Sequence, residues 1–186
     1  MIQFRWRSVL FILTNILFSL FLPKIKNKHN DSFDIVHFEK KYLYEIEKIY
    51  SSELGNGNLL SRSIKIILFL CGNKTAFVIL NSNNSVIGYA FYYFNFNDLK
   101  KLYIHAASAA VLPDYRQSIY GGSLYFYAFD WFKYNTWIRG ISARYRVSNR
   151  PVKRLHDYLG YKVITRYFKD EEEWVYVICD FNKGWK

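Results

Sequence analysis

Residues 111–124, VLPDYRQSIYGGSL, constrain the fold of this chain more than any other stretch. They place a proline turn, an Arg-Gln pair and two adjacent glycines between an apolar run and a helix-like segment. A helix start leaves several backbone amides unpaired and carries the positive end of the helix dipole. Glycines there let the oxygens of a phosphate reach the main chain. The stretch therefore predicts a strand, a turn and an anion-binding helix start, although a glycine pair also suits an ordinary turn.

The flanking segments predict alternating strands and helices. Residues 102–112 and 139–147 have the composition of strands. A helix should follow the second strand, because Asn149 suits an N-cap, Pro151 suits a first turn and Gly160 suits the position past a helix end. The other predicted elements are a strand at 33–38, helices at 40–54 and 59–70, a hairpin at 74–80 and 86–95, a helix through 125–133, and last strands at 161–167 and 174–181.

With these elements in order, the chain resembles the GNAT superfamily of acyl-CoA-dependent N-acetyltransferases over roughly residues 33–181. The first shared motif, V-x-P-x-Y-R-x-x-G-x-G-x-x-L, is matched by Val111, Pro113, Tyr115, Arg116, Gly121 and Leu124. The second, N-x-x-A-x-x-L-Y-x-x-x-G-F, is matched at Asn149, Leu155 and Gly160, with Val152, His156 and Tyr161 at its Ala, Tyr and Phe positions. Both motifs in this order, with a helix and a strand between them, form a specific signal.

Two departures from the family pattern affect function. Ile119 replaces the first glycine of the phosphate loop, so a side chain enters a place where the main chain is normally bare. Gly122, directly after Gly121, restores some room. His156 stands where the family often has a tyrosine that protonates the leaving thiolate. Either the imidazole takes over that proton or the enzyme has lost catalysis.

The resemblance implies an α+β fold, with a mixed, mainly antiparallel central sheet, helices on both faces and a splayed strand pair. The splayed strands would be 102–112 and 139–147, and the gap between them would bind acetyl-CoA as co-substrate, without a metal. The predicted cofactor-binding residues are Ala109, Val111, Arg116, Gln117, Ser118, Ile119, Tyr120, Gly121, Gly122 and Asn149.

The implied reaction is acetyl transfer by direct attack of an amine on the thioester, with the oxyanion stabilised by a backbone N–H. The predicted proton carriers are His156 as general acid and His105 as general base. Each also has a structural interpretation, as a surface helical histidine and a satisfied core histidine. The acceptor is expected to be a small-molecule amine or an amino sugar.

Two other functions remain open for this sequence. One is a GNAT-fold binding module without turnover, with Ile119 and His156 marking the decay of the enzyme. The other is a nucleic-acid-binding protein, which the formal charge of +11 permits. The basic residues are scattered, and the absence of a clustered basic and aromatic stripe argues against nucleic acid. Biased composition also explains the charge without any polyanionic partner.

The length of the chain fits a single domain, and its cysteine usage fits reduced thiols. A chain of 186 residues is long enough for one ordinary hydrophobic core. Cys71 and Cys179 lie far apart and form no C-x-x-C pair, so nothing in the sequence points to metal or redox chemistry.

Residues 1–32 are predicted to be a hydrophobic extension and linker ahead of a GNAT-like domain at 33–186. Residues 9–22 are nearly all apolar, fewer than the ~20 that a spanning helix needs. Trp6 and the basic flanks favour a short anchoring helix on an anionic membrane surface. The alternative is an extension packed on the domain. Since acyl-CoA is cytosolic, we expect a cytoplasmic domain, at the inner face of the membrane if the anchor forms.

Overall fold

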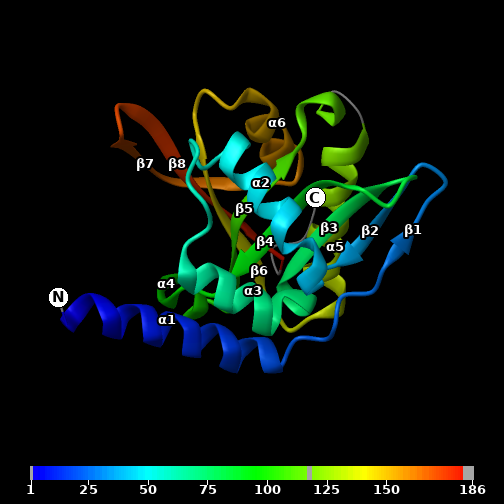
Figure 1. Cartoon of the computed structure of the whole chain (residues 1–186). Coiled ribbons are helices and arrows are strands. Elements are labelled where there is room, and N and C mark those ends of the chain that lie inside the picture. The colour runs from blue at the N-terminus through cyan, green and yellow to red at the C-terminus, as the bar shows by residue number, and fades with distance from the viewer. Residues whose placement is uncertain (1, 117–118, 182–186) are drawn as a thin grey trace.

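The computed structural model describes residues 2–116 and 119–181, and Figure 1 shows their arrangement. The elements are α1 (Ile2–Leu20), β1 (Lys28–His29), β2 (Phe33–His37), the 3-10 turn η1 (Lys40–Tyr42), α2 (Leu43–Glu53), α3 (Arg62–Thr75), β3 (Ala76–Asn81), β4 (Val86–Tyr93), α4 (Phe96–Leu99), β5 (Tyr103–Val111), η2 (Pro113–Tyr115), α5 (Ile119–Asn135), β6 (Gly140–Arg146), α6 (Arg150–Tyr158), β7 (Lys162–Lys169) and β8 (Glu172–Asp180). From β2 onward this is the predicted order, with the short helix α4 added.

The strands form one sheet in the order β1-β2-β3-β4-β5-β6-β8-β7. Its neighbours pair antiparallel, apart from β5 and β6, which pair parallel. A parallel pair needs a crossover, and α5 supplies it. The predicted mixed, mainly antiparallel sheet of an α+β fold is confirmed.

The two parallel strands separate after a short shared stretch. Residues 103–106 of β5 pair with 140–143 of β6, and the last partners are Ala106 and Ala143. Beyond this point β5 stays with β4, and β6 stays with β8. A bulge lies beside the separation, because Phe91 and Tyr92 of β4 face Ser108 and Ala106, which leaves Ala107 as the extra residue. The predicted splayed pair is therefore present.

Helices cover both faces of the sheet (Figure 1). On one face, Ile46 of α2 and Leu68 of α3 pack against β3 and β4. On the other face, Phe132 of α5 lies against Phe77 of β3 and Tyr92 of β4, with ring centroids 5.7 and 4.7 Å away. Apolar side chains of β3 and β4 point alternately to the two faces, so both faces contribute to a core.

The ends of α6 follow the sequence signals. Asn149 is the N-cap, and its Oδ1 accepts a hydrogen bond from the Val152 amide at 3.3 Å. Pro151 lies in the first turn, where a missing N–H has no cost. Gly160 follows the last turn with φ +75°, a conformation that favours glycine. These caps fix the start of α6 beside the splayed strands.

The N-terminal helix α1 packs along α3. Asn15 is fully buried; its Nδ2 donates to the carbonyl of Phe94 at 3.0 Å, and its Oδ1 accepts from the Phe94 amide at 2.7 Å. Lys74 of α3 donates to the carbonyl of Ser19 at 3.0 Å. Residues 28–29, predicted as linker, add β1 to the sheet. None of the helices in the described ranges has the length and hydropathy that a membrane crossing requires.

Candidate functional site

The gap between β5 and β6 is lined by main-chain groups of β5. The amide of Leu112 donates to the carbonyl of Ile87 on β4 at 2.9 Å, so Leu112 and Ala110 direct their polar groups toward β4. Alternate residues of a strand face the same side, and Ala109 and Val111 therefore direct theirs into the gap. These are the two β5 residues predicted to contact the pantetheine arm.

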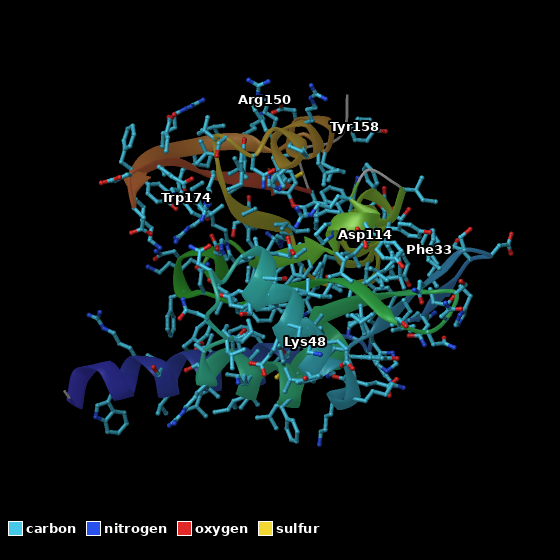
Figure 2. All side chains as sticks on the ribbon, turned by 45° about the horizontal axis from the view of Figure 1, so that its top comes forward. Phe33, Lys48, Asp114, Arg150, Tyr158 and Trp174 are labelled. Atoms are coloured by element: carbon cyan, nitrogen blue, oxygen red, sulfur yellow. The ribbon has the colours of Figure 1, made fainter. Side chains whose placement is uncertain are left out.

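The start of α5 closes one end of this gap. Ile119 is 64% exposed, so its side chain does not fill the space between the strands. A Cβ on Gly121 would stand 3.5 Å from Val111, and one on Gly122 would stand 3.9 Å from Phe126, which are ordinary contacts. Gln117 and Ser118 lie outside the described residues. In Figure 2, Asp114 marks the turn before α5, and Arg150 and Tyr158 mark the two ends of α6.

Two predicted phosphate contacts have other partners in this structure. The guanidinium of Arg116 forms an ion pair with Glu53 of α2, and its Nε donates to the Val111 carbonyl at 3.2 Å. The ring of Tyr120 packs edge-on against Phe33, with centroids 5.4 Å apart. The side chain of Tyr120 is therefore used in packing, which leaves only its main chain for the predicted phosphate contact.

His105 belongs to a buried polar network at the point where the strands separate. Ile104 and Ala106 face α5, so His105 lies on the opposite face, which α2 and α3 cover. Its Nδ1 lies 2.7 Å from the Ser142 hydroxyl, which donates to Asp98 Oδ2 at 2.5 Å. The Ser142 hydroxyl must therefore accept from Nδ1–H, so in the neutral form of the ring the lone pair lies on Nε2. This is the tautomer that a general base requires.

Asp98 is the charged member of this network. Burial raises the pKa of its carboxyl, but hydrogen bonds from His105, Ser142 and Tyr176 outweigh burial and lower the pKa to about 2. Asn95 supports the same carboxylate through its amide Nδ2. Burial and the hydrogen bond to Asp98 raise the pKa of Tyr176 to about 12. The Asp98 carboxylate is therefore charged near neutral pH and accepts the hydrogen bonds of this network.

Sequence reasoning identified His105 but missed Asp98, Ser142 and Tyr176. A usable signal was present for Ser142 and for Asp98. Ser142 interrupts an apolar strand between Ile141 and Ala143, and Asp98 follows Asn95 at capping distance, where an Asn side chain accepts from a main-chain amide. Sequence alone could not show that these segments meet.

His156 is buried in a cage of aromatic rings. Its Nε2 lies 2.6 Å from the Tyr125 hydroxyl, and the rings of Tyr145 and Tyr161 lie 5.0 and 4.4 Å away by centroid. Burial lowers the pKa of its imidazole to about 4. The ring is therefore neutral near pH 7 and lacks the second proton that an imidazolium acid donates. His156 and His105 lie on opposite sides of the sheet, since Tyr125, Tyr145 and Tyr161 belong to the core under α5.

The comparisons with known proteins agree with this geometry. Residues 40–161, more than half of the chain, match the family model described as the acetyltransferase (GNAT) family. The chain belongs to the GNAT acetyltransferase family. Among curated protein sequences, none matches this GNAT chain significantly.

Solved structures share the fold of this GNAT chain at low identity. An N-acetyltransferase from Staphylococcus aureus Mu50 is 19% identical with a TM-score of 0.67, covering 80% of this chain and 98% of its own. The yncA protein of Salmonella typhimurium, determined with its cofactor acetyl-CoA, is 16% identical with a TM-score of 0.66, covering 83% and 96%. The ribosomal-protein-S18-alanine N-acetyltransferase of Escherichia coli is 17% identical with a TM-score of 0.61, covering 84% and 94%.

Proposed function

We propose that this GNAT acetyltransferase moves an acetyl group from acetyl-CoA to an amine. The separation of β5 and β6 after Ala106 and Ala143 supports the proposal most strongly. It leaves main-chain donors and acceptors that an extended amide chain such as pantetheine can satisfy. The helix start at the end of the gap suits the pyrophosphate of the same molecule.

In this proposal the cofactor is held mostly by main chain. Ala109 and Val111 bind the pantetheine amides, and the backbone from residue 116 to Gly122 binds the pyrophosphate. Arg116 adds charge-assisted hydrogen bonds when it exchanges Glu53 for phosphate. Asn149 uses Oδ1 as the cap of α6, so its Nδ2 is the group that can donate to pantetheine.

His105 acts as the general base. Acetyl-CoA supplies the acetyl group as a thioester, and the acceptor nitrogen forms the new amide bond as the C–S bond breaks. The acceptor nitrogen must lose a proton, and Nε2 of His105 takes it directly or through one water. Asp98 and Ser142 orient the ring and stabilise the positive charge that it gains, and they act as positioning residues.

The role predicted for His156 needs an experiment of its own. A proton donor at this position would have to release the proton of a neutral imidazole, because burial holds its pKa near 4. We therefore propose that His156 orders Tyr125 and α6 under the gap. The thiolate proton would then come from another donor or from water.

The acceptor would enter from the face that α2 and α3 cover, where His105 lies. The guanidinium of Arg144 is exposed on this face and stacks over the ring of Tyr176 at 5.6 Å. An acceptor with a carboxylate or phosphate near its amine would find a partner there. Amino sugars carried on phosphates and peptide amines both meet this description. A thiol-release screen with acetyl-CoA and pooled amines would identify the class.

Gly121→Val tests the cofactor site. The first added atom fits the folded chain, since it would meet Val111 at an ordinary distance. We expect acetyl-CoA affinity by calorimetry to fall at least about tenfold, because the branched side chain crowds the main chain where phosphate binds. Gly122→Ala is the matched control for thermal stability. Unchanged affinity in a folded Gly121→Val variant would contradict the phosphate-loop assignment.

A binding module without turnover is the second candidate. The neutral, enclosed His156 favours it, because the usual tyrosine acid of the family is missing. Acetyl-CoA binding without thiol release for any amine would support this candidate. Salt-sensitive binding to RNA, without affinity for acetyl-CoA, would point instead to a nucleic-acid-binding protein.

A further inference from the structure

Helix α1 presents an apolar stripe that no part of the described chain covers. Trp6, Leu10, Leu13, Leu17 and Leu20 follow one another at spacings of four, three, four and three residues. Such spacing places side chains along one side of a helix. Each is between 52% and 70% exposed, whereas Thr14, Asn15 and Ser19 on the other side are buried. Burial of the polar residues against the domain leaves the leucines facing outward.

Helix α3 extends this apolar surface. It packs beside α1, and Lys74 joins the two by donating to the carbonyls of Ser19 and Leu20. Ile66, Phe69 and Leu70 of α3 are 42–55% exposed. Exposed apolar residues gathered on two helices that pack together mark an interaction site more often than scattered residues do.

A basic hollow opens next to Phe69 and Leu70. Its volume is about 620 Å³, and Lys24, Lys40 and Lys41 line it together with one carboxylate, Glu39. Lys41 pairs with Glu39 at 3.1 Å, and Lys40 Nζ lies 3.6 Å from the centre of the Phe69 ring. The lysines outnumber the carboxylate, so the hollow suits phosphate oxygens.

Charge decides which partner this surface fits. No Asp or Glu occurs in residues 2–30 or in residues 62–75, so α1, its connection to β1 and α3 contribute only basic charge. A second copy would bring two basic surfaces together, which costs free energy. An anionic bilayer offers acyl chains to the leucines and, in the headgroup layer just above them, phosphates to the lysines.

We propose that the surface formed by α1, α3 and the basic hollow docks on an anionic membrane, with α1 lying in the plane of the interface. The apolar stripe enters the boundary of the acyl chains, and Trp6 sits at the level of the headgroups. Figure 1 shows α1 along the lower side of the molecule, with α6 and the beginning of α5 on the upper side. The proposed acetyl-CoA opening therefore stays clear of the bilayer.

Vesicle co-sedimentation of the full chain tests this docking. Wild type should sediment with vesicles that contain phosphatidylserine and much less with pure phosphatidylcholine. Leu13→Glu/Leu17→Glu should weaken binding roughly a hundredfold, because two buried leucines are lost. Lys24→Glu/Lys40→Glu should weaken it at least about fivefold for each lysine lost.

Matched variants separate docking from general effects. Ile164→Glu/Phe168→Glu replaces two exposed apolar residues of β7 by carboxylates, as Leu13→Glu/Leu17→Glu does on α1. Lys101→Glu reverses the charge of an exposed lysine outside the proposed docking surface. Both should bind vesicles as wild type does. Thermal unfolding shows that each variant folds. The proposal is overturned if wild type does not bind anionic vesicles, if the controls lose binding equally, or if Leu13→Glu/Leu17→Glu only separates a dimer.

Discussion

The imidazole of His156 makes the stability of this GNAT acetyltransferase sensitive to acid. In the unfolded chain a histidine takes up its proton near its ordinary pKa of 6.5, whereas burial lowers the pKa of the folded group to about 4. Between these values the unfolded chain binds more protons, so stability falls as pH falls. At about 1.36 kcal/mol for each pH unit, the full loss is about 3 kcal/mol.

The structure supplies the cause of this penalty. Nε2 already meets the Tyr125 hydroxyl, and Nδ1 is buried without a hydrogen-bond partner in the described residues. A second proton would therefore place an unpaired charged donor among aromatic rings. His156→Gln keeps a polar group near the Nε2 position and removes the titration.

Urea unfolding of both proteins, at pH values from neutral to about 4.5, measures this effect. We expect the stability advantage of wild type over His156→Gln to shrink by roughly 2–3 kcal/mol across that range. A difference that stays constant with pH would refute the reasoning. His156→Gln also tests catalysis. If His156 were a general acid, its loss would lower turnover ~10²–10⁴-fold. If His156 only packs, turnover per folded molecule stays nearly unchanged. We expect the second result.

Two further variants probe the other buried polar groups. Asp98→Asn removes the charge beside His105 and should lower kcat about 10- to 100-fold. The Kd for acetyl-CoA should not change, because the substitution alters the base and not the cofactor site. Asp157→Asn, on the exposed side of α6, is the control, and equal losses of kcat in both variants would contradict the base assignment. Asn15→Leu leaves the amide and carbonyl of Phe94 unpaired and should cost about 2–5 kcal/mol in chemical unfolding; a loss below about 1 kcal/mol would show that α1 is not anchored through Asn15.

Local signals predicted the order of elements from β2 onward. Asn149, Pro151 and Gly160 mark the ends of α6 because capping depends on a few neighbouring residues. The site was harder to predict. Ser142 and Asp98 meet His105 only because β5 pairs with β6 and α4 folds under both, which no spacing in the sequence encodes.

The N-terminal segment shows the same limit. Its apolar run suggested either an anchor or a packed extension. Asn15, whose partner Phe94 lies far along the chain, shows that the segment packs on the domain, and the apolar side that stays exposed carries the proposed membrane contact. An Asn in an apolar helix indicates a buried polar contact, but the sequence does not show which residue the Asn contacts. The outward stripe on α1 is visible in the sequence only once the buried side is known.

The short junction between β5 and β6 has a mechanical consequence. Only four residues of β5 pair with four residues of β6. This junction joins the half of the sheet with β1 to β5 to the half with β6, β8 and β7, so the two halves are weakly coupled in the middle of the domain. If a pantetheine arm occupies the opening, it bridges both halves as a ninth strand would. Substrate would then act as a structural staple, and hydrogen exchange in β6 and β8 should slow when acetyl-CoA saturates the protein.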